Sequence, residues 1–420
     1  MNLPDYFVNP QSCGQYRIEN LPGTILSMLT SERPAGVLPP EAFSKVKGDY
    51  DKVVLLLVDG IGWAQFANLA IGRPFIGRLI EDGALHKLAT QFPSTTACNV
   101  TTVNTGLSVL QHGLYEWFYY EPKADDIIAP LLYAYAREQS VRDSLKRDTN
   151  VRPAEIYPAG SLYQKLSSHG VKGYAFQNNE YARSTFSDLI FKPATVGGFE
   201  STADGLAALA KAILAETEKA YFYFYYDGID SALHHYGPGS EQVAATFTQF
   251  LTDLEEVFWR AISSAGKDKA GKVVFILTAD HGQTSIDPAR TIYLNREFPE
   301  IEGYMRRNRA GRVMAPAGSC RDMFLYVREE CLDDAFSLLQ EKLDGRAVVC
   351  CTTDLISGGY FGAGEPSEAL GGRLGNLVIL PLQGESVWWY EKDVFEVTFK
   401  GHHGGLTRDE MEIPLLIWSI

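Results

Sequence analysis

Two aspartates in the sequence directly follow continuous apolar runs. Asp59 follows residues 53–58 and stands before a glycine, while Asp280 follows residues 273–279 and is joined directly to His281. Ligands of open α/β sheets bind at the carboxyl ends of the strands, and an acid buried there without a charge partner would be costly. Both aspartates are therefore candidate metal ligands, although Asp59 alone fits a turn residue that caps a helix equally well.

The segment 227–238 offers a carboxylate and an imidazole on one helical face. Asp230 and His234 are four residues apart, so on a helix they lie on the same side, one turn apart. Such a pair suits Zn²⁺, although a lone Asp/His pair is more often a surface hydrogen bond. Asp227 and His235 are the competing members of the pair.

A further source of imidazoles is the sequence Gly-His-His-Gly-Gly at 401–405. The flanking glycines allow close approach of the backbone, and either His402 or His403 could bind an ion. Five of the eight histidines lie in this segment and in the two that hold Asp230 and Asp280. The other three are interpreted as structural: His86, His112 and His169.

The candidate nucleophile is a threonine at the start of a predicted helix. Residues 92–99 read Phe-Pro-Ser-Thr-Thr-Ala-Cys-Asn, and the helix is predicted to end near Gly106. Free backbone N–H groups at a helix N-terminus form a phosphate site. A metal ion there could lower the pKa of the Thr96 hydroxyl, so that its oxygen attacks phosphorus. Alone, the motif fits an ordinary helix cap better, so it indicates a nucleophile only together with the ligand motifs.

Taken together, these motifs offer three carboxylates, three imidazoles and a hydroxyl. That set fits two divalent ions with a hydroxyl nucleophile that bridges them or binds one of them. Mixed aspartate and histidine ligands favour Zn²⁺ over Mg²⁺. We therefore predict a two-metal hydrolase that acts on a small phosphate ester or a nucleotide-like substrate.

The elements that must position these residues alternate between apolar runs and helical patterns. Short continuous apolar runs, as in buried parallel strands, occur at residues 53–58, 221–226, 273–279, 377–380 and 415–417. Between them, apolar residues at three- and four-residue spacing predict helices at 205–218, 241–264 and 333–343. Alternating strands and helices predict an α/β fold with a central, largely parallel sheet.

The length of the chain allows one large domain with an insertion. Residues 1–284 and 401–420 are predicted to form the catalytic core, and residues 285–400 an inserted subdomain with its own strand–helix–strand pattern. Because this segment leaves the core just after His281 and returns just before His403, we expect it to pack beside the metals and shape substrate access. Its candidate substrate contacts are Arg321, Tyr360 and Arg373.

The composition is that of an ordinary globular chain with an acidic balance. The formal net charge is −14, which on average repels nucleic-acid polymers and anionic membranes. Bound cations can reverse the local field for a small anionic substrate. The sequence shows no signal-peptide pattern and no apolar run of membrane-spanning length. Its six cysteines show no paired spacing and are expected to be reduced. We predict a cytoplasmic location, and the sequence leaves the oligomeric state open.

The five motifs, in this order, resemble the alkaline phosphatase superfamily, and most of all its nucleotide pyrophosphatase/phosphodiesterase branch with its bacterial members. The matching residues are 57–60, 92–96, 230–238, 278–282 and 401–404. They span nearly the whole chain from about residue 50, whereas the first 45 or so residues match nothing. The resemblance implies an alkaline phosphatase-like three-layer α/β sandwich.

The resemblance also implies a role for each site residue. One ion, usually zinc in the family, would be held by Asp230, His234 and His403. The other would be held by Asp59, Asp280 and His281, with Thr96 as both ligand and nucleophile. Asn99 keeps the place of an asparagine that helps to hold the phosphoryl oxygens, although the Phe-Pro before it in the branch is here Ala97-Cys98.

The activity implied is that of a phosphodiesterase or nucleotide pyrophosphatase that works through a phospho-threonine intermediate. With the same metal site, a phosphomonoesterase or a hydrolase of phosphonate or sulfate esters is the alternative. A catalytically inactive binding protein is the alternative from another class. It is disfavoured because every inferred ligand position holds a competent residue.

A diester is favoured over a monoester on the composition around the nucleophile. No lysine or arginine occurs from Leu88 to Pro122, whereas the second charge of a monoester usually meets a cationic group beyond the metals. Several aromatic residues nearby could stack on a base or pack against an apolar leaving group, or could simply belong to the core. They are Tyr115, Trp117, Phe118, Tyr119 and Tyr120.

Overall fold

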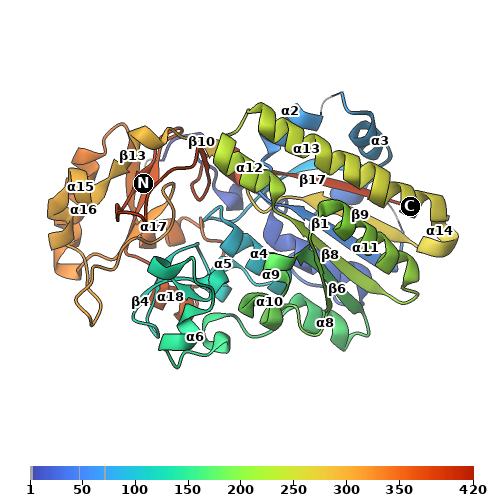
Figure 1. Ribbon diagram of the computed structural model, residues 1–420, viewed down its shortest axis with the longest axis horizontal. Coiled ribbons are helices and arrows are strands. Elements are labelled where there is room, and N and C mark those ends of the chain that lie inside the picture. The colour runs from blue at the N-terminus through green and yellow to red at the C-terminus, as the bar shows by residue number, and fades with distance from the viewer. Residues whose placement is uncertain (1–2, 47, 71) are drawn as a thin grey trace.

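A seven-stranded sheet forms the centre of the protein in a computed structural model that describes residues 3–46, 48–70 and 72–420 (Figure 1). Its strand order is β2-β17-β9-β1-β8-β6-β7. The strands are β1 (Lys52–Val58), β2 (Ala84–Ala89), β6 (Lys172–Asn178), β7 (Thr195–Phe199), β8 (Ala220–Tyr226), β9 (Val273–Thr278) and β17 (Glu412–Ser419). From β9 to β7 all neighbouring strands are parallel, which confirms the predicted mostly parallel sheet.

Two of the predicted parallel strands run differently. The run 415–417 lies in β17, which pairs antiparallel with both β9 and β2. The run 377–380 lies in β14 (Leu377–Pro381), the middle strand of a separate antiparallel sheet with β12 (Met323–Leu325) and β13 (Ala347–Cys351). The prediction of parallel strands is wrong at both places. Burial on both faces makes a strand continuously apolar whatever its direction.

Helices cover both faces of the sheet and complete the three-layer sandwich (Figure 1). One face carries α11 (Thr202–Ala215), α13 (Glu241–Asp253) and α14 (Arg260–Ala270), and the other carries α1 (Leu21–Leu29), α4 (Thr96–Thr105) and α8 (Leu162–Ser168). The predicted helix 241–264 is present, with a π-helical segment, η6 (Leu254–Trp259), between α13 and α14. The predicted helices 205–218 and 333–343 correspond to α11 and to α16 (Leu332–Lys342).

Helix α4 is held in the interior by its ends and by its own side chains. It begins after Thr95, whose backbone is extended, and ends at Gly106, which adopts the left-handed conformation at φ 73°. Thr101 and Thr105 donate their hydroxyls to carbonyl oxygens four residues earlier at 2.7 Å. Those bonds satisfy hydroxyl groups that would otherwise be buried without a partner. They allow α4 to lie in the core, which holds its N-terminus in a fixed position.

Most of the chain between Thr284 and Lys400 forms the lobe on the left of Figure 1, where β13, α15 (Leu294–Glu297), α16 and α17 (Thr352–Ser357) are labelled. The two ends of this segment meet because β10 (Thr284–Ser285) pairs antiparallel with β16 (Gly401–His402). This pairing is what an insertion into a core domain requires. The division into a core of residues 1–284 and 401–420 and a subdomain of residues 285–400 stays a prediction.

The remaining chain-wide predictions concern the cysteines, the N-terminal segment and the membrane. All six cysteines are free. The N-terminal segment packs on the core, since the Val8 amide donates to the Leu406 carbonyl at 2.8 Å and α1 lies against α4 and α8. Among the helices of the described residues, none is long and apolar enough to cross a membrane. The cytoplasmic location stays a prediction.

Candidate active site

The candidate site lies at the carboxyl ends of three adjacent strands, β9, β1 and β8. Asp59 follows β1, Asp280 follows β9, and α12 (Gly228–Tyr236) begins after β8 and carries Asp230. The turn after β1 needs a glycine, because Gly60 has φ +77° and a Cβ there would lie 2.8 Å from the Asp230 Cα. Parallel strands thus bring together carboxylates that are far apart in the sequence.

The first group of candidate ligands is Asp230, His234 and His403. Donor atoms of these three residues all lie within 4.8 Å of one another, and His234 Nε2 is 3.4 Å from Asp230 Oδ2. His235, the competing imidazole, is exposed and its Nδ1 lies 2.8 Å from the carbonyl oxygen of Ser231 in its own helix. The structure therefore brings together the residues chosen from the sequence.

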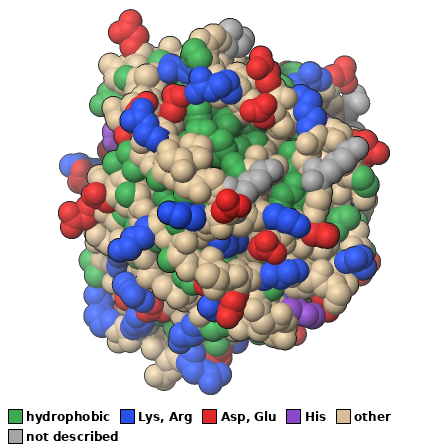
Figure 2. Space-filling model, turned by 90° about the vertical axis from the view of Figure 1, so that its right-hand side faces the viewer, with side chains coloured by type: hydrophobic (Ala, Val, Ile, Leu, Met, Phe, Trp, Pro, Cys, Tyr) green, Lys and Arg blue, Asp and Glu red, His purple; other side chains and the backbone are tan. Residues whose placement is uncertain are grey.

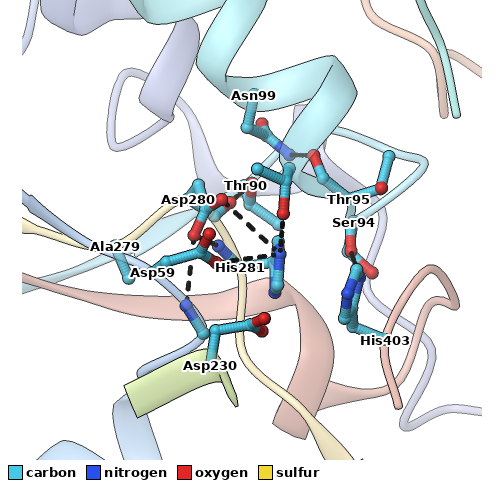
Figure 3. A network of polar contacts seen from close by, with 12 residues as sticks. Asp59, Thr90, Ser94, Thr95, Asn99, Asp230, Ala279, Asp280, His281 and His403 are labelled. Atoms are coloured by element: carbon cyan, nitrogen blue, oxygen red, sulfur yellow. Dashed lines mark hydrogen bonds and ion pairs between the residues drawn. The ribbon is translucent and has the colours of Figure 1, made fainter. Parts of the chain in front are cut away.

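The second group surrounds His281 Nε2. That atom is 3.0 Å from Thr96 Oγ1, 3.3 Å from Asp59 Oδ1 and 3.5 Å from Asp280 Oδ2 (Figure 3). Ligand atoms about 2.0 Å from a tetrahedral ion are about 3.3 Å apart, so this spacing fits one ion. Donor atoms of Asp230, Asp59 and His281 also lie within 4.8 Å of one another, which places the two groups side by side.

All three imidazoles are oriented with one nitrogen available for a metal. The Nδ1 atoms of His234, His281 and His403 lie 2.8, 3.1 and 3.0 Å from the carbonyl oxygens of Gly401, Gly282 and Ser94, respectively. Because a carbonyl only accepts hydrogen bonds, each Nδ1 carries the proton and each Nε2 keeps a lone pair. Metal-binding histidines typically have this second hydrogen bond.

The carboxylates in the site lack the partners that burial demands. Asp59 Oδ1 and Asp280 Oδ2 are buried and accept no hydrogen bond within the described residues. Burial first, and then the Asp280 and Asp230 carboxylates, raise the pKa of Asp59 well above its usual value. Burial and the neighbouring imidazoles of His281 and His234 lower the pKa of His403, so its ring is neutral. Neutral imidazoles and crowded carboxylates are what divalent cations bind, so the residues fit the predicted ions.

Two residues that the sequence did not single out orient these ligands. The Tyr225 hydroxyl donates to Asp59 Oδ2, and the Gln283 side-chain amide donates to Asp230 Oδ1. Gln283 follows the Asp280-His281 pair closely in the sequence, and Tyr225 belongs to the aromatic run before Asp230. Their types gave no signal of this role, because a tyrosine in a buried strand and a glutamine in a loop are common.

Asn99 lies one helical turn after Thr95 in α4 and is completely buried. Its Nδ2 donates to the Thr95 carbonyl at 3.0 Å, and its Oδ1 accepts from the Gln91 amide at 3.2 Å. The side chain thus braces the turn that leads into Thr96 (Figure 3). One N–H of its amide group remains for another acceptor, and its contact with phosphoryl oxygens stays a prediction.

A cavity of about 390 Å³ opens onto Thr96 and the first ligand group. Its apolar wall is aromatic and comes mostly from residues far along the chain: Trp117, Phe118, Trp388, Phe395 and Phe399. Among the described residues that line it there is no lysine or arginine. Of the aromatic residues singled out near the nucleophile, Trp117 and Phe118 line the cavity, whereas Tyr115 and Tyr119 are fully buried in the core.

The predicted substrate contacts Arg321 and Arg373 belong to the core instead. Arg321 is fully buried, and its Nε and Nη2 each lie 3.0 Å from an oxygen of the Glu410 carboxylate. Arg373 is buried too, with its Nε 2.8 Å from Glu121. That prediction is wrong, because a buried guanidinium needs a carboxylate partner of its own. Tyr360 also lies outside the lining of the cavity.

His112, which follows α4 in the sequence and was interpreted as structural, has a partner at each ring nitrogen. Its Nε2 lies 3.0 Å from Thr102 Oγ1, and its Nδ1 accepts from the Leu114 amide at 3.0 Å. Burial, reinforced by the nearby Arg373, lowers the pKa of His112 to about 3. The ring is therefore a neutral brace within the core.

Comparison with known proteins agrees with this geometry. The family described as type I phosphodiesterase / nucleotide pyrophosphatase matches residues 53–406. The sequence matches none of the curated proteins with which it was compared. Murine ectonucleotide pyrophosphatase/phosphodiesterase 5, in an inactive form complexed with AMP, shares the fold at a TM-score of 0.64 and 16% identity, over 87% of each chain.

A bacterial structure shows the same likeness of fold. Phosphonoacetate hydrolase from Sinorhizobium meliloti, in complex with phosphonoformate, superposes with a TM-score of 0.58 and 16% identity. The match covers 87% of this chain and 89% of the hydrolase. The two solved structures thus share the arrangement of the sheet and its helices with this chain.

Proposed function

The chain belongs to the type I phosphodiesterase/nucleotide pyrophosphatase family and is a phosphoric ester hydrolase, and we propose that it cleaves phosphodiesters or nucleotide-like pyrophosphates through a phospho-threonine intermediate on Thr96, with two zinc ions. The observation that carries the proposal is the convergence on His281 Nε2. Thr96 Oγ1 lies 3.0 Å from that atom, with Asp59 and Asp280 carboxylate oxygens close by. A hydroxyl among metal ligands at a helix N-terminus is suited to attack phosphorus.

Bound ions would supply two effects here: a lower pKa for the Thr96 hydroxyl and neutralisation of charge on the phosphoryl group. The chain supplies the rest. The free N–H groups at the start of α4 bind phosphoryl oxygens while Thr96 Oγ1 attacks in line. As the Thr96 ester forms, the hydroxyl proton passes to solvent, and the bond from phosphorus to the leaving group breaks with its electron pair on the leaving oxygen. Water then hydrolyses that ester and restores the hydroxyl.

The cavity supports a diester rather than a monoester as substrate. Its described lining lacks lysine and arginine, and its wall offers the rings of Trp117, Phe118 and Trp388. A diester carries one charge and a second substituent that such rings can pack against or stack on. The murine relative was solved with AMP, a phosphate monoester, whose base is the kind of group that such rings can stack on.

The test is to compare kcat/KM for a nitrophenyl monoester and a matched nitrophenyl diester on the zinc-loaded protein. We expect the diester to be preferred, and Thr96→Ala to lose turnover of both. A phosphorylated peptide that contains Thr96, trapped during turnover and identified by mass spectrometry, would identify the intermediate. A strong monoester preference would contradict the choice of a diester while leaving the metal site and Thr96 unaffected.

A further inference from the structure

A second pair of buried acids lies beside the nucleophile, away from the histidines. Glu116 stands between α5 (Val109–His112) and β3 (Tyr119–Glu121), and Asp322 directly precedes β12. Both side chains are fully buried. Glu116 Oε1, Asp322 Oδ2 and the Thr95 hydroxyl oxygen form no hydrogen bond of good geometry within the described residues. Since buried polar atoms are nearly always paired, three orphan atoms at one place indicate a functional group.

Glu116 brings this group to the wall of the substrate cavity. Glu116 lines the same cavity as Thr96, and the Asp322 carboxyl and the Thr95 hydroxyl face its carboxyl group. The other carboxylate oxygen of Glu116 accepts from the Trp117 amide, which fixes the side chain. Glu116 therefore has one oxygen fixed by the backbone and a second oxygen that faces Asp322 and Thr95.

Asp322 is in turn fixed by Ser319, which lies against the loop that carries His403. Its Oδ1 accepts from the Ser319 amide at 3.0 Å and the Ser319 hydroxyl at 2.6 Å. Gly404 makes the close approach possible, because a Cβ there would lie 2.5 Å from that same oxygen, at a backbone φ of +123°. The pair is thus built into the active-site framework.

Among the described residues, no lysine or arginine forms an ion pair with either acid. Arg321 is next to Asp322 in the sequence, but its guanidinium is bound to Glu410. The titratable and charged groups that act on the two acids are Cys98, Tyr115, Cys320, Arg321 and Glu410. Two adjacent buried carboxylates cannot both ionise under these conditions. Burial raises the pKa of Glu116 to about 8, and burial together with Glu116 raises the pKa of Asp322.

We propose that Glu116 is a substrate-binding residue whose neutral carboxyl group, packed against Asp322, donates a hydrogen bond to a phosphoryl oxygen beside Thr96. This inference rests on the proposed function. Phosphorus must come within about 3–3.5 Å of Thr96 Oγ1 to react, so its oxygens come close to the wall formed by Glu116. An ionised carboxylate would repel them, whereas a neutral acid supplies a donor in a cavity without lysine or arginine.

The experiment compares Glu116→Gln and Glu116→Ala in the zinc-loaded protein, with a nitrophenyl diester across neutral and alkaline pH. Glu116→Ala should lower kcat/KM about 10²-fold, the effect of removing one donor to a developing oxyanion. Glu116→Gln keeps an N–H donor that cannot ionise, so it should stay within about tenfold of wild type and lose the alkaline decline.

If Glu116 had only a structural role, its variants would lose stability rather than substrate binding. Thermal melting of each variant separates loss of fold from loss of function, and the exposed Glu300→Gln is the matched control. The proposal is overturned if Glu116→Ala is as active as wild type, or if Glu116→Gln loses as much as Glu116→Ala. A wild-type protein without turnover of any ester overturns the proposed function and this inference together. Active wild type with active Glu116→Ala overturns this inference alone.

Discussion

Two groups of acidic residues flank Thr96 and differ in the side chains that surround them. Asp59, Asp230 and Asp280 lie among imidazoles whose Nε2 lone pairs are free, so a divalent cation can neutralise the group. Glu116 and Asp322 have no imidazole, lysine or arginine partner among the described residues, so a shared proton is the remaining way to relieve their repulsion. The comparison teaches that the neighbours of a buried carboxylate, rather than its burial, decide which cation it binds.

The largest expected loss of activity follows from a change at Thr96, which lies between the two groups. Thr96→Ala removes the reacting hydroxyl, so kcat should fall by about 10⁵- to 10⁶-fold, as for other catalytic nucleophiles. The fold should remain because the change removes little core volume, and both ions should remain because their aspartate and histidine ligands are unchanged. Thr95→Ala is the comparison and should lose far less activity. The reverse result, with Thr96→Ala active and Thr95→Ala dead, would shift the nucleophile by one residue.

The next effect tests whether the histidine-containing group alone holds metal. Asp280→Asn should lose one ion and lower kcat/KM by about 10³-fold, since an ion contributes several kcal/mol of transition-state stabilisation. Asp322→Asn is the matched change in the other acidic group and should keep both ions. Metal content per chain, measured beside turnover, distinguishes the two. Loss of an ion in Asp322→Asn would contradict the claim that only the histidine-containing group holds metal.

The free energy of unfolding should depend on pH through the proton bound by the Glu116 and Asp322 pair. Between its unfolded pKa of 4.5 and its folded pKa of about 8, Glu116 ionises in the unfolded chain while the folded chain keeps the proton. Stability contributed by this group therefore falls as pH rises through that window. Glu116→Gln should remove this loss and gain about 2–4 kcal/mol relative to wild type by pH 8. Urea unfolding at about pH 5 and pH 8 measures it, and equal pH dependence in both proteins would contradict the shared proton.

A smaller effect, on metal affinity, is expected from the Tyr225 hydroxyl, which orients the ligand Asp59. Tyr225→Phe removes the hydroxyl that donates to Asp59, so metal affinity should fall about 10- to 100-fold. Tyr223→Phe is the control, because that hydroxyl lies in the same strand and has no hydrogen-bond partner among the described residues. Competition with a chelator measures both. Equal affinities in the two variants would mean that the Tyr225 hydroxyl has no part in orienting Asp59.

The strand-end part of the site could be predicted from the sequence. A buried parallel strand that ends in an acid is visible as an apolar run followed by aspartate, and the parallel order of β9 and β1 then puts Asp280 beside Asp59. The four-residue spacing of Asp230 and His234 likewise fixes a shared helical face. Local patterns were sufficient here because each ligand is positioned by the element next to it.

The rest depends on contacts that no local pattern encodes. The direction of β17 is set by its partners β9 and β2 rather than by its own apolar residues. Glu116 stands out only once Asp322 is folded against it, and Trp388 and Phe395 join the cavity only through the fold of the segment before His403. Arg321 was misassigned because its carboxylate partner, Glu410, lies far along the chain.

The most direct test of the whole account is turnover of a nitrophenyl diester before and after complete removal of metal. We predict two zinc ions per chain in the active protein, loss of turnover on chelation, and recovery when zinc is restored. The same treatment of Asp280→Asn should recover little activity, because one ligand oxygen is missing. Full activity in thoroughly metal-depleted protein would contradict the account.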